Sequence, residues 1–204
     1  MAPRLSRDAK QEASHEFFNS GLHIPTRTLY MGSVPDADGE EGGTDFRMAD
    51  RVIKGLHILD IDSDEGINII MNNPGGDEYH GLAIFDAIKN CRSHVVITVF
   101  GMGMSMGSVI LQAGDERILA PNSRIMIHYG TWEPYGQHSK AVYKWCDEGK
   151  KFDAWMRTMY LEKMREKIPD MTEKKLDGML DFDTILTAQE AIDLGLADKI
   201  LGEK

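Results

Sequence analysis

The sequence is poor in the features that mark membrane, secreted and metal-binding proteins. Only two cysteines occur among its 204 residues, too few for a disulfide framework, and they lack the spacing of metal ligands. No apolar run approaches the roughly 18 residues that a membrane span needs. The N-terminal residues lack the apolar segment of a secretory signal. These absences favour a protein of the cytoplasm that does not associate with a membrane.

An excess of positive charge is missing as well. The net charge is −10, which argues against nucleic acid or an anionic membrane as the main partner. The sequence has no Gly-x-x-x-x-Gly-Lys-Ser/Thr phosphate-binding loop, so the chain has no evident means of using ATP itself. With 42% hydrophobic residues, the chain can bury one sizeable core, and the expected class is α/β.

Strand and helix patterns alternate along most of the chain and predict a mostly parallel sheet with flanking helices. Residues 1–23 are mixed and polar, and we expect an N-terminal arm that is flexible or ordered by a partner. Residues 24–204 are expected to form a single domain. The acidic, glycine-rich segment 35–43 is interpreted as a solvated loop. Apolar residues at helical spacing, Trp155 among them, predict a long helix over about 139–167.

One predicted strand-to-helix junction carries a serine between glycines. A buried strand is expected over 95–100, a turn over 101–107, and a short helix over 108–114. The hydroxyl of Ser105 would stand at the end of the sheet, beside the first unpaired amides of the helix. Those amides suit an anion that develops beside the serine. Taken alone, however, the turn favours the alternative that Ser105 only caps the helix.

Two further segments follow predicted strands. Asn73-Pro74-Gly75-Gly76 exposes backbone amides at the strand end where ligands bind in parallel α/β sheets, although a Pro-Gly pair also makes an ordinary tight turn. His128 ends an apolar strand downstream of Ser105, whereas the other six histidines stand in polar or loop contexts. A general base must reach the serine hydroxyl through a hydrogen bond. Neighbouring strands that end at one sheet edge can provide that contact.

In order and spacing, three segments resemble the signature segments of ClpP, the proteolytic subunit family of Clp protease, which has a crotonase-like fold. They are Asn73–Gly76, Ser105–Gly107 and Pro121–His128. The likeness extends from about residue 24 to Leu201. The resemblance implies an α/β, ClpP/crotonase-like fold whose long helix protrudes as a handle.

The resemblance also implies a serine endopeptidase. Ser105 would attack the peptide carbonyl, and His128 would take and return its proton. The amides of Gly76 and Met106 would hold the oxyanion, with Gly75 shaping that turn. No metal and no cofactor is implied by such a site.

The third catalytic residue of the family is an aspartate just before a Leu-Ser/Thr-Ala segment that opens a late helix. Here that segment is Leu186–Ala188, within a predicted capping box of Thr187 and Glu190. Matched residue by residue, the aspartate falls on Asp183, with Asp181 a competitor two positions earlier. Without the family, nothing singles out either among the 33 acidic residues.

As for partners, the resemblance implies a homo-oligomer of two stacked heptameric rings, paired through the handle helix. A separate AAA+ unfoldase ATPase would feed unfolded polypeptides or peptides into the enclosed chamber. The chain departs from the family pattern at Gly103-Met104, where the family usually has Ala-Ala beside the serine. It departs again after His128, over 129–137, which indicates changed preferences of the substrate-lining strand.

Three alternatives to a cellular Clp-type protease remain at this point. The first is a crotonase-like acyl-CoA enzyme that uses the oxyanion hole without a nucleophile. The second is a non-catalytic ClpP-like assembly subunit, against which the presence of both Ser105 and His128 argues. The third is a viral capsid-maturation protease, because the departures suggest a divergent branch.

Overall fold

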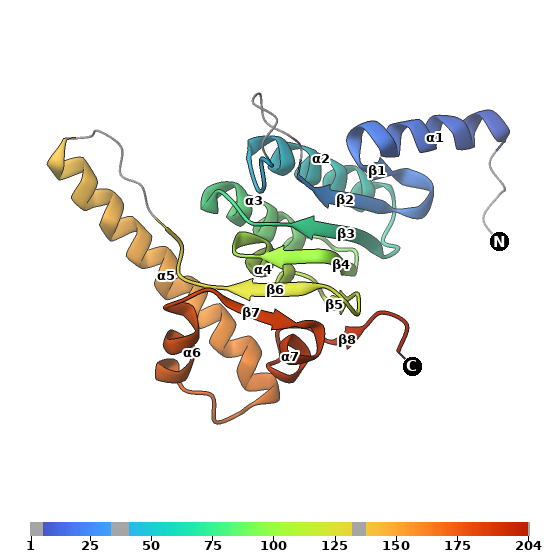
Figure 1. The fold of residues 1–204 in the computed structure, drawn as a ribbon. Helices are drawn as coiled ribbons and strands as arrows, with labels where there is room; N and C mark the ends of the chain where they lie inside the picture. Colours follow the sequence, from blue (N-terminus) through green and yellow to red (C-terminus); the bar gives the residue numbers. More distant parts are fainter. Residues whose placement is uncertain (1–5, 34–40, 132–137, 204) are drawn as a thin grey trace.

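The computed structural model describes residues 6–33, 41–131 and 138–203. An eight-stranded sheet forms its centre, with helices packed against it (Figure 1). The strands are β1 (Leu22–His23), β2 (Thr28–Gly32), β3 (Ile67–Asn73), β4 (Val95–Met104), β5 (Glu116–Leu119), β6 (Arg124–Ile127), β7 (Thr184–Thr187) and β8 (Lys199–Ile200). The helices are α1 (Arg7–Ser20), the 3-10 turn η1 (Ile24–Thr26), α2 (Phe46–Asp62), α3 (Glu78–Lys89), α4 (Met106–Leu111), α5 (Ser139–Lys167), α6 (Glu173–Leu180) and α7 (Ala188–Asp193).

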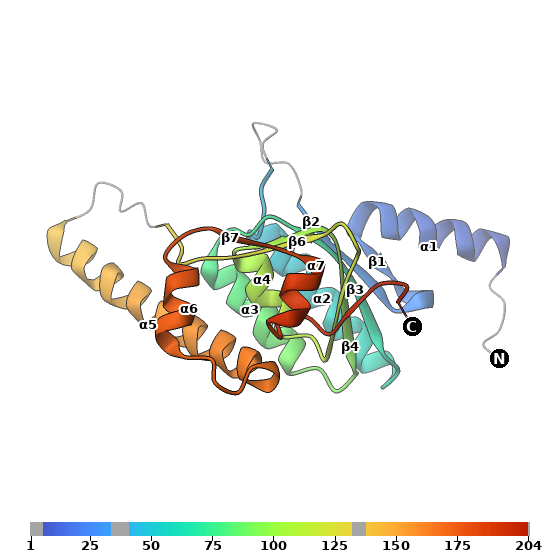
Figure 2. The same ribbon diagram turned by 60° about the horizontal axis from the view of Figure 1, so that its bottom comes forward.

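The sheet is mostly parallel, which confirms the predicted α/β class. Its main path runs β1-β2-β3-β4-β5-β8, and β6 and β7 branch from β4. The pairings β1–β2 and β6–β7 are antiparallel, and all the others are parallel. Helices α2, α3 and α4 lie together along one face of the sheet (Figure 2). The connections from β2 to β3 and from β3 to β4 are therefore the helical crossovers that parallel strands require.

The central strands bury alternate side chains, as period-two strands do. In β3 these are Ile67, Ile69 and Met71, and in β4 they are Val95, Ile97 and Val99. Helix α2 covers them with an apolar stripe at helical spacing, formed by Met48, Ala49, Val52, Leu56 and Leu59. The core thus lies between the sheet and its crossover helices, and it holds the ends of β3 and β4 in place.

Strand β4 is longer than the sequence predicts. The glycine-rich segment from Gly101 is not a turn but continues the strand to Met104. The reason is a change of partner: the first half of β4 pairs with β5, and its end pairs with β6. The turn is confined to Ser105. Helix α4 follows at once from Met106, earlier than the predicted start at Ser108.

The N-terminal residues form α1, none of whose residues is buried. Gly21 ends this helix in the left-handed conformation, with φ 76°, and β1 then pairs with β2. The division of the chain at residue 24 stays a prediction. Most of the acidic loop, 34–40, and the segment 132–137 after His128 lie outside the described residues.

Helix α5 has the bounds that the sequence predicts, Ser139–Lys167. At 1.5 Å per residue it is on the order of 40 Å long. Its N-terminal half projects beyond the sheet (Figure 1), whereas Met156, Tyr160 and Met164 in its second half are buried in the core. No helix of the described chain is long and apolar enough to cross a membrane.

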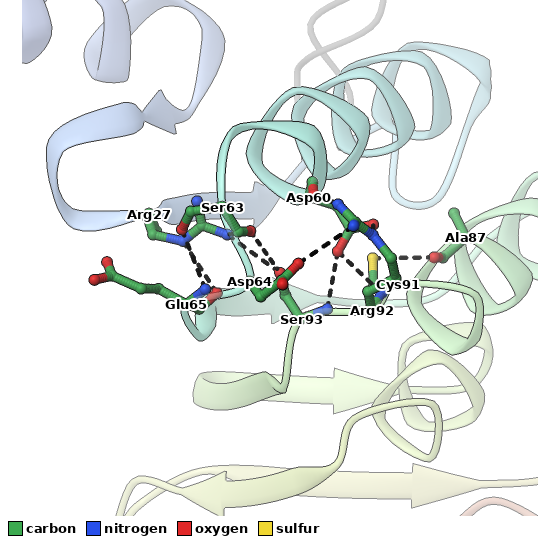
Figure 3. A network of polar contacts seen from close by, with 9 residues as sticks. All are labelled: Arg27, Asp60, Ser63, Asp64, Glu65, Ala87, Cys91, Arg92 and Ser93. Atoms are coloured by element: carbon green, nitrogen blue, oxygen red, sulfur yellow. Dashed lines mark hydrogen bonds and ion pairs between the residues drawn. The ribbon is translucent and has the colours of Figure 1, made fainter.

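A network of polar contacts joins the segments that enter β2, β3 and β4 (Figure 3). The guanidinium of Arg27, only 6% exposed, donates to the backbone carbonyls of Ser63, Glu65 and Gly66. It also donates to the hydroxyl of Ser93, at 3.2 Å. One buried side chain therefore donates hydrogen bonds to three backbone carbonyls of the segment between α2 and β3.

Asp60, near the end of α2, completes this network. Its carboxylate accepts hydrogen bonds from the backbone N–H groups of Ser93 and Arg92, both at 2.9 Å. These bonds, the one from Ser93 foremost, hold the pKa of Asp60 below its usual value. The network fixes the amino-terminal ends of the strands relative to α2.

Candidate active site

Ser105 stands at the sharp turn between β4 and α4. Its backbone has φ 50° and ψ −120°, a conformation that costs a residue other than glycine free energy. Four hydrogen bonds hold it there. Its N–H donates to the carbonyl of Met126, and its carbonyl accepts from the N–H groups of Ser108 and Val109 and from the hydroxyl of Ser108. Ser105 occupies the N-cap position of α4, but its side chain makes no capping bond. The hydroxyl is therefore directed elsewhere.

The Ser105 hydroxyl lies against His128. The distance from Ser105 Oγ to His128 Nε2 is 2.8 Å, and His128 Nδ1 lies 2.8 Å from Asp183 Oδ1. An ionised carboxylate can only accept, so Nδ1 carries the ring proton. Nε2 is then the acceptor for the serine O–H. The imidazole is 17% exposed and the carboxylate 66% exposed in this single chain.

Strand register explains how these three residues meet. Met104 of β4 pairs with Met126 of β6, so Ser105 lies just past the end of this pairing. In the antiparallel pair of β6 and β7, Ile127 lies opposite Thr184. One residue further along the same register, His128 lies opposite Asp183. The competitor Asp181 is the C-cap residue of α6 instead, and its side chain is exposed.

The turn after β3 packs directly on Ser105. Gly75 and Gly76 have φ values of 103° and 142°, which favour glycine. A Cβ atom added at Gly75 would lie 2.6 Å from Cβ of Ser105. The buried side chain of Asn73 accepts from the N–H of Gly75 at 2.8 Å and also bonds to the Thr44 hydroxyl. The turn at Gly75-Gly76 can approach Ser105 closely because glycine has no side chain.

The match to a family model decides which family carries this site. The model described as Clp protease matches residues 41–204.

The chain belongs to the Clp protease family.

Curated relatives of the Clp protease family agree with this assignment. The chain is 34% identical to a protein of Deinococcus radiodurans named ATP-dependent Clp protease proteolytic subunit, over 98% of this chain and 91% of that one. It is 33% identical to ATP-dependent Clp protease proteolytic subunit 3 of Parasynechococcus marenigrum, over 86% and 82%. It is 32% identical to the chloroplastic subunit 3 of Arabidopsis thaliana, over 92% of this chain and 57% of that one.

Two backbone N–H groups near Ser105 in this Clp protease family member have no acceptor among the described residues. Met106 is the first residue of α4, so its N–H has no acceptor within the helix. Gly76 forms an isolated bridge with Thr44, but the bonds of that bridge come from the N–H groups of Thr44 and Asp77. The N–H of Gly76 is not used in it. Both residues line the same cavity as Ser105 and His128.

A buried hydrogen bond anchors the helix that carries the serine, and the sequence gives no signal for it. The hydroxyl of Ser108 lies 2.6 Å from the hydroxyl of Tyr160 on α5. Tyr160 is 1% exposed, and this burial raises the pKa of its hydroxyl. Because Ser108 also donates to the carbonyl of Ser105, the long helix supports the strained turn through one intermediate side chain.

A cavity of about 410 Å³ opens beside Ser105 and His128. Its walls come from the N-terminal end of α3, from α4 and from α5. Among the described residues that line it are the carboxylates of Asp77, Glu78 and Asp153, which the sequence analysis did not single out. No group of three or more His, Cys, Asp or Glu side chains in the described chain could hold a metal ion.

Proposed function

We propose that the chain hydrolyses peptide bonds with Ser105 as nucleophile, His128 as general base and Asp183 as the residue that orients the imidazole. Membership of the Clp protease family makes the chain a serine peptidase of the Clp type. One observation carries the assignment of roles: the continuous hydrogen-bonded path from Ser105 through His128 to Asp183, with 2.8 Å at each step.

The chemistry follows from this path. As Oγ of Ser105 attacks the peptide carbonyl, its proton passes to Nε2 of His128, and the Asp183 carboxylate stabilises the imidazolium that forms. The carbonyl oxygen becomes an oxyanion, for which the N–H groups of Gly76 and Met106 are the proposed donors. His128 then gives its proton to the leaving amine. A water molecule, activated in the same way, releases the acyl group from Ser105.

The test is covalent labelling of the purified chain with a fluorophosphonate, followed by mass-spectrometric location of the adduct. We expect a single adduct on Ser105 that is absent from the Ser105→Ala and His128→Ala variants. Labelling of another residue would reject the assignment. A folded chain that neither reacts nor hydrolyses peptides would reject it as well, and would favour an acyl-CoA enzyme or a non-catalytic subunit.

Assembly into two stacked heptameric rings through α5 is the second part of the proposal. The projecting half of α5 exposes Tyr143 by 68%, and large exposed aromatic residues are frequent at interfaces. Trp155 is a poorer candidate for this contact, because its ring packs edge-on against Phe85 of the same chain, 5.2 Å between centroids. Tyr143→Glu should lower the sedimentation coefficient of the assembly, whereas Trp155→Phe should not.

An unfoldase partner is the third part of the proposal, supported by the words "ATP-dependent" in the names of the relatives. If the active sites line an enclosed chamber, the chain alone should cut short peptides and spare stable folded proteins. Efficient degradation of both without an ATPase would reject the chamber. A cytoplasmic location belongs to the same proposal, since Cys91 and Cys146 are both free thiols, as is usual in reducing compartments.

A further inference from the structure

The cavity beside Ser105 carries charge of one sign. The charged residues among its described lining are Asp77, Glu78 and Asp153, and no lysine or arginine of the described chain contributes to it. Glu78 opens α3, and Asp153 comes from α5 across the cavity. The space next to the scissile bond is therefore bounded by carboxylates from two different helices.

Glu78 and Asp153 lack partners within the described chain: no hydrogen bond or ion pair joins either carboxylate to another described residue. Both side chains are partly buried. Burial raises the pKa of both carboxyl groups, and the charges of Asp77, Asp153 and Glu148 raise that of Glu78 further. Lys151 of the adjoining groove does not relieve this repulsion, because its ammonium pairs with Glu148 at 2.7 Å.

Apolar side chains form part of the remaining cavity wall. Val109 of α4 and Met156 of α5 are buried, and Phe152 of α5 packs against the core beside them. Such walls suit the methylene stem of a long side chain, which can lie along apolar surface while its charged end reaches polar groups. The cavity thus combines an apolar channel with unpaired carboxylates.

We propose that this cavity receives the side chain on the acyl side of the scissile bond, the P1 side chain, and that Glu78 and Asp153 make it selective for lysine or arginine. The inference rests on the proposed function, because the cavity is next to the scissile bond only if Ser105 is the nucleophile. It goes further by naming the substrate class: peptides and unfolded chains cut after a basic residue.

The choice among P1 side chains follows from desolvation. An apolar side chain would fill the cavity and remove water from the two carboxylates without pairing them, which costs free energy. An acidic side chain would add repulsion. A lysine ammonium or an arginine guanidinium pairs with the carboxylates as it displaces the water, so its contact is favourable. A site whose buried polar groups need a partner discriminates against substrates whose P1 side chain cannot form that pair.

The experiment compares three fluorogenic peptides that differ only at P1: lysine, norleucine, which has a similar straight stem without the ammonium, and glutamate. We expect kcat/KM to be about tenfold or more higher for lysine than for norleucine, and lowest for glutamate. Glu78→Gln and Asp153→Asn should each lower the lysine value by about tenfold and leave the norleucine value within about twofold. The matched control is Glu162→Gln, which makes the same carboxylate-to-carboxamide change at an exposed position of helix α5. It should change neither kcat/KM value.

Fluorophosphonate labelling of Ser105 is measured first in every variant. The labelling tests the peptidase assignment, and the peptide comparison then tests the preference for a basic P1 residue separately. A chain that labels fully but prefers norleucine, with a ratio unchanged in both Glu78→Gln and Asp153→Asn, overturns the specificity and leaves the peptidase assignment standing. A folded chain that neither labels nor cuts any peptide overturns both. If one substitution prevents folding, the other variant and the wild-type ratio of kcat/KM for the lysine and norleucine peptides still test the specificity. Glu78→Lys should move the preference from lysine towards glutamate.

Discussion

The two ends of the sheet carry different polar networks. At the amino-terminal ends of the strands, the buried guanidinium of Arg27 and the carboxylate of Asp60 bond to backbone groups on several segments. At the carboxyl-terminal ends, Ser105 has a strained backbone, and the carboxylates of Glu78 and Asp153 have no partner among the described residues.

The difference separates stability from reactivity. Paired polar groups lower the free energy of the folded chain, whereas unpaired and strained ones raise it and persist only where the surroundings hold them. Ligands bind at the carboxyl ends of parallel strands, so the unpaired groups lie where a substrate can pair them. Substitutions at the carboxyl end should therefore change activity, and those at the amino end should change stability.

The largest effect is expected at the serine. Ser105→Ala and His128→Ala should each lower peptide hydrolysis by about 10⁴-fold or more, because members of a catalytic triad act as a unit. The free energy of unfolding should fall little in Ser105→Ala, since the change removes one partly buried hydrogen bond, to His128. Steady-state peptide hydrolysis and urea unfolding test this. Near wild-type turnover in either folded variant would contradict its catalytic role. It would also contradict the assignment of activity to the carboxyl-terminal ends of the strands.

The next effect compares two aspartates of the same loop. Asp183→Asn should lower kcat by about 10²- to 10⁴-fold, because an amide in place of the carboxylate no longer fixes the tautomer that accepts the serine proton. Asp181→Asn changes an exposed C-cap residue and should leave kcat within about twofold. Kinetics with one peptide substrate measure both. The reverse order would mean that Asp181 is the orienting carboxylate.

At the amino-terminal end the effect should fall on stability. Arg27→Met keeps the apolar stem but leaves the carbonyls of Ser63, Glu65 and Gly66 without the guanidinium donor, and we expect a loss of about 2–4 kcal/mol in the free energy of unfolding. Arg92→Met, at a side chain 62% exposed, should cost about 0–1 kcal/mol. Under conditions where both variants are folded, their fluorophosphonate labelling rates should match wild type. A strongly reduced rate in Arg27→Met would show that the two ends are coupled.

The smallest effect concerns a thiol beside the amino-terminal network. Burial, with the nearby carboxylates of Asp60 and Asp115, raises the pKa of Cys91 to about 11. The thiolate is the reactive form, so in a Cys146→Ser chain the rate of Cys91 alkylation should keep rising to near pH 11. The rate for a free cysteine levels off near its pKa of about 8.5. A plateau near that lower pH in the folded chain would contradict the burial of Cys91.

Much of the fold follows from local pattern, and the site follows only in part. Alternating apolar residues predict β3, and helical spacing predicts α5 with its observed bounds, because these signals lie within one element. The extension of β4 to Met104 depends on the late pairing with β6, which no local pattern contains. Asp183 was named through the resemblance alone, since a carboxylate in a loop is chosen by strand register and not by its neighbours in sequence.

The cavity was missed for a similar reason. Glu78 looks like a common acidic residue in the first turn of a helix, and Asp153 looks like one of many charges on α5. Their significance comes from facing one space without a partner, which only the packing of α3 against α5 reveals. Ser108 and Tyr160 likewise meet across 52 residues of sequence. The catalytic roles of Ser105, His128 and Asp183 stay a proposal that the labelling experiment decides.

The antiparallel register of β6 and β7 has a consequence for how such chains can diverge. His128 and Asp183 are separated by 55 positions in the sequence, yet their distance depends only on the few residues of the two strands. Insertions or deletions in the loops between β6 and β7 that leave α5 intact would not move the two side chains apart. A single residue added within β6 or β7 would instead turn one of them to the opposite face of the sheet. The loops between these two strands can therefore change in length while His128 and Asp183 stay within hydrogen-bond distance.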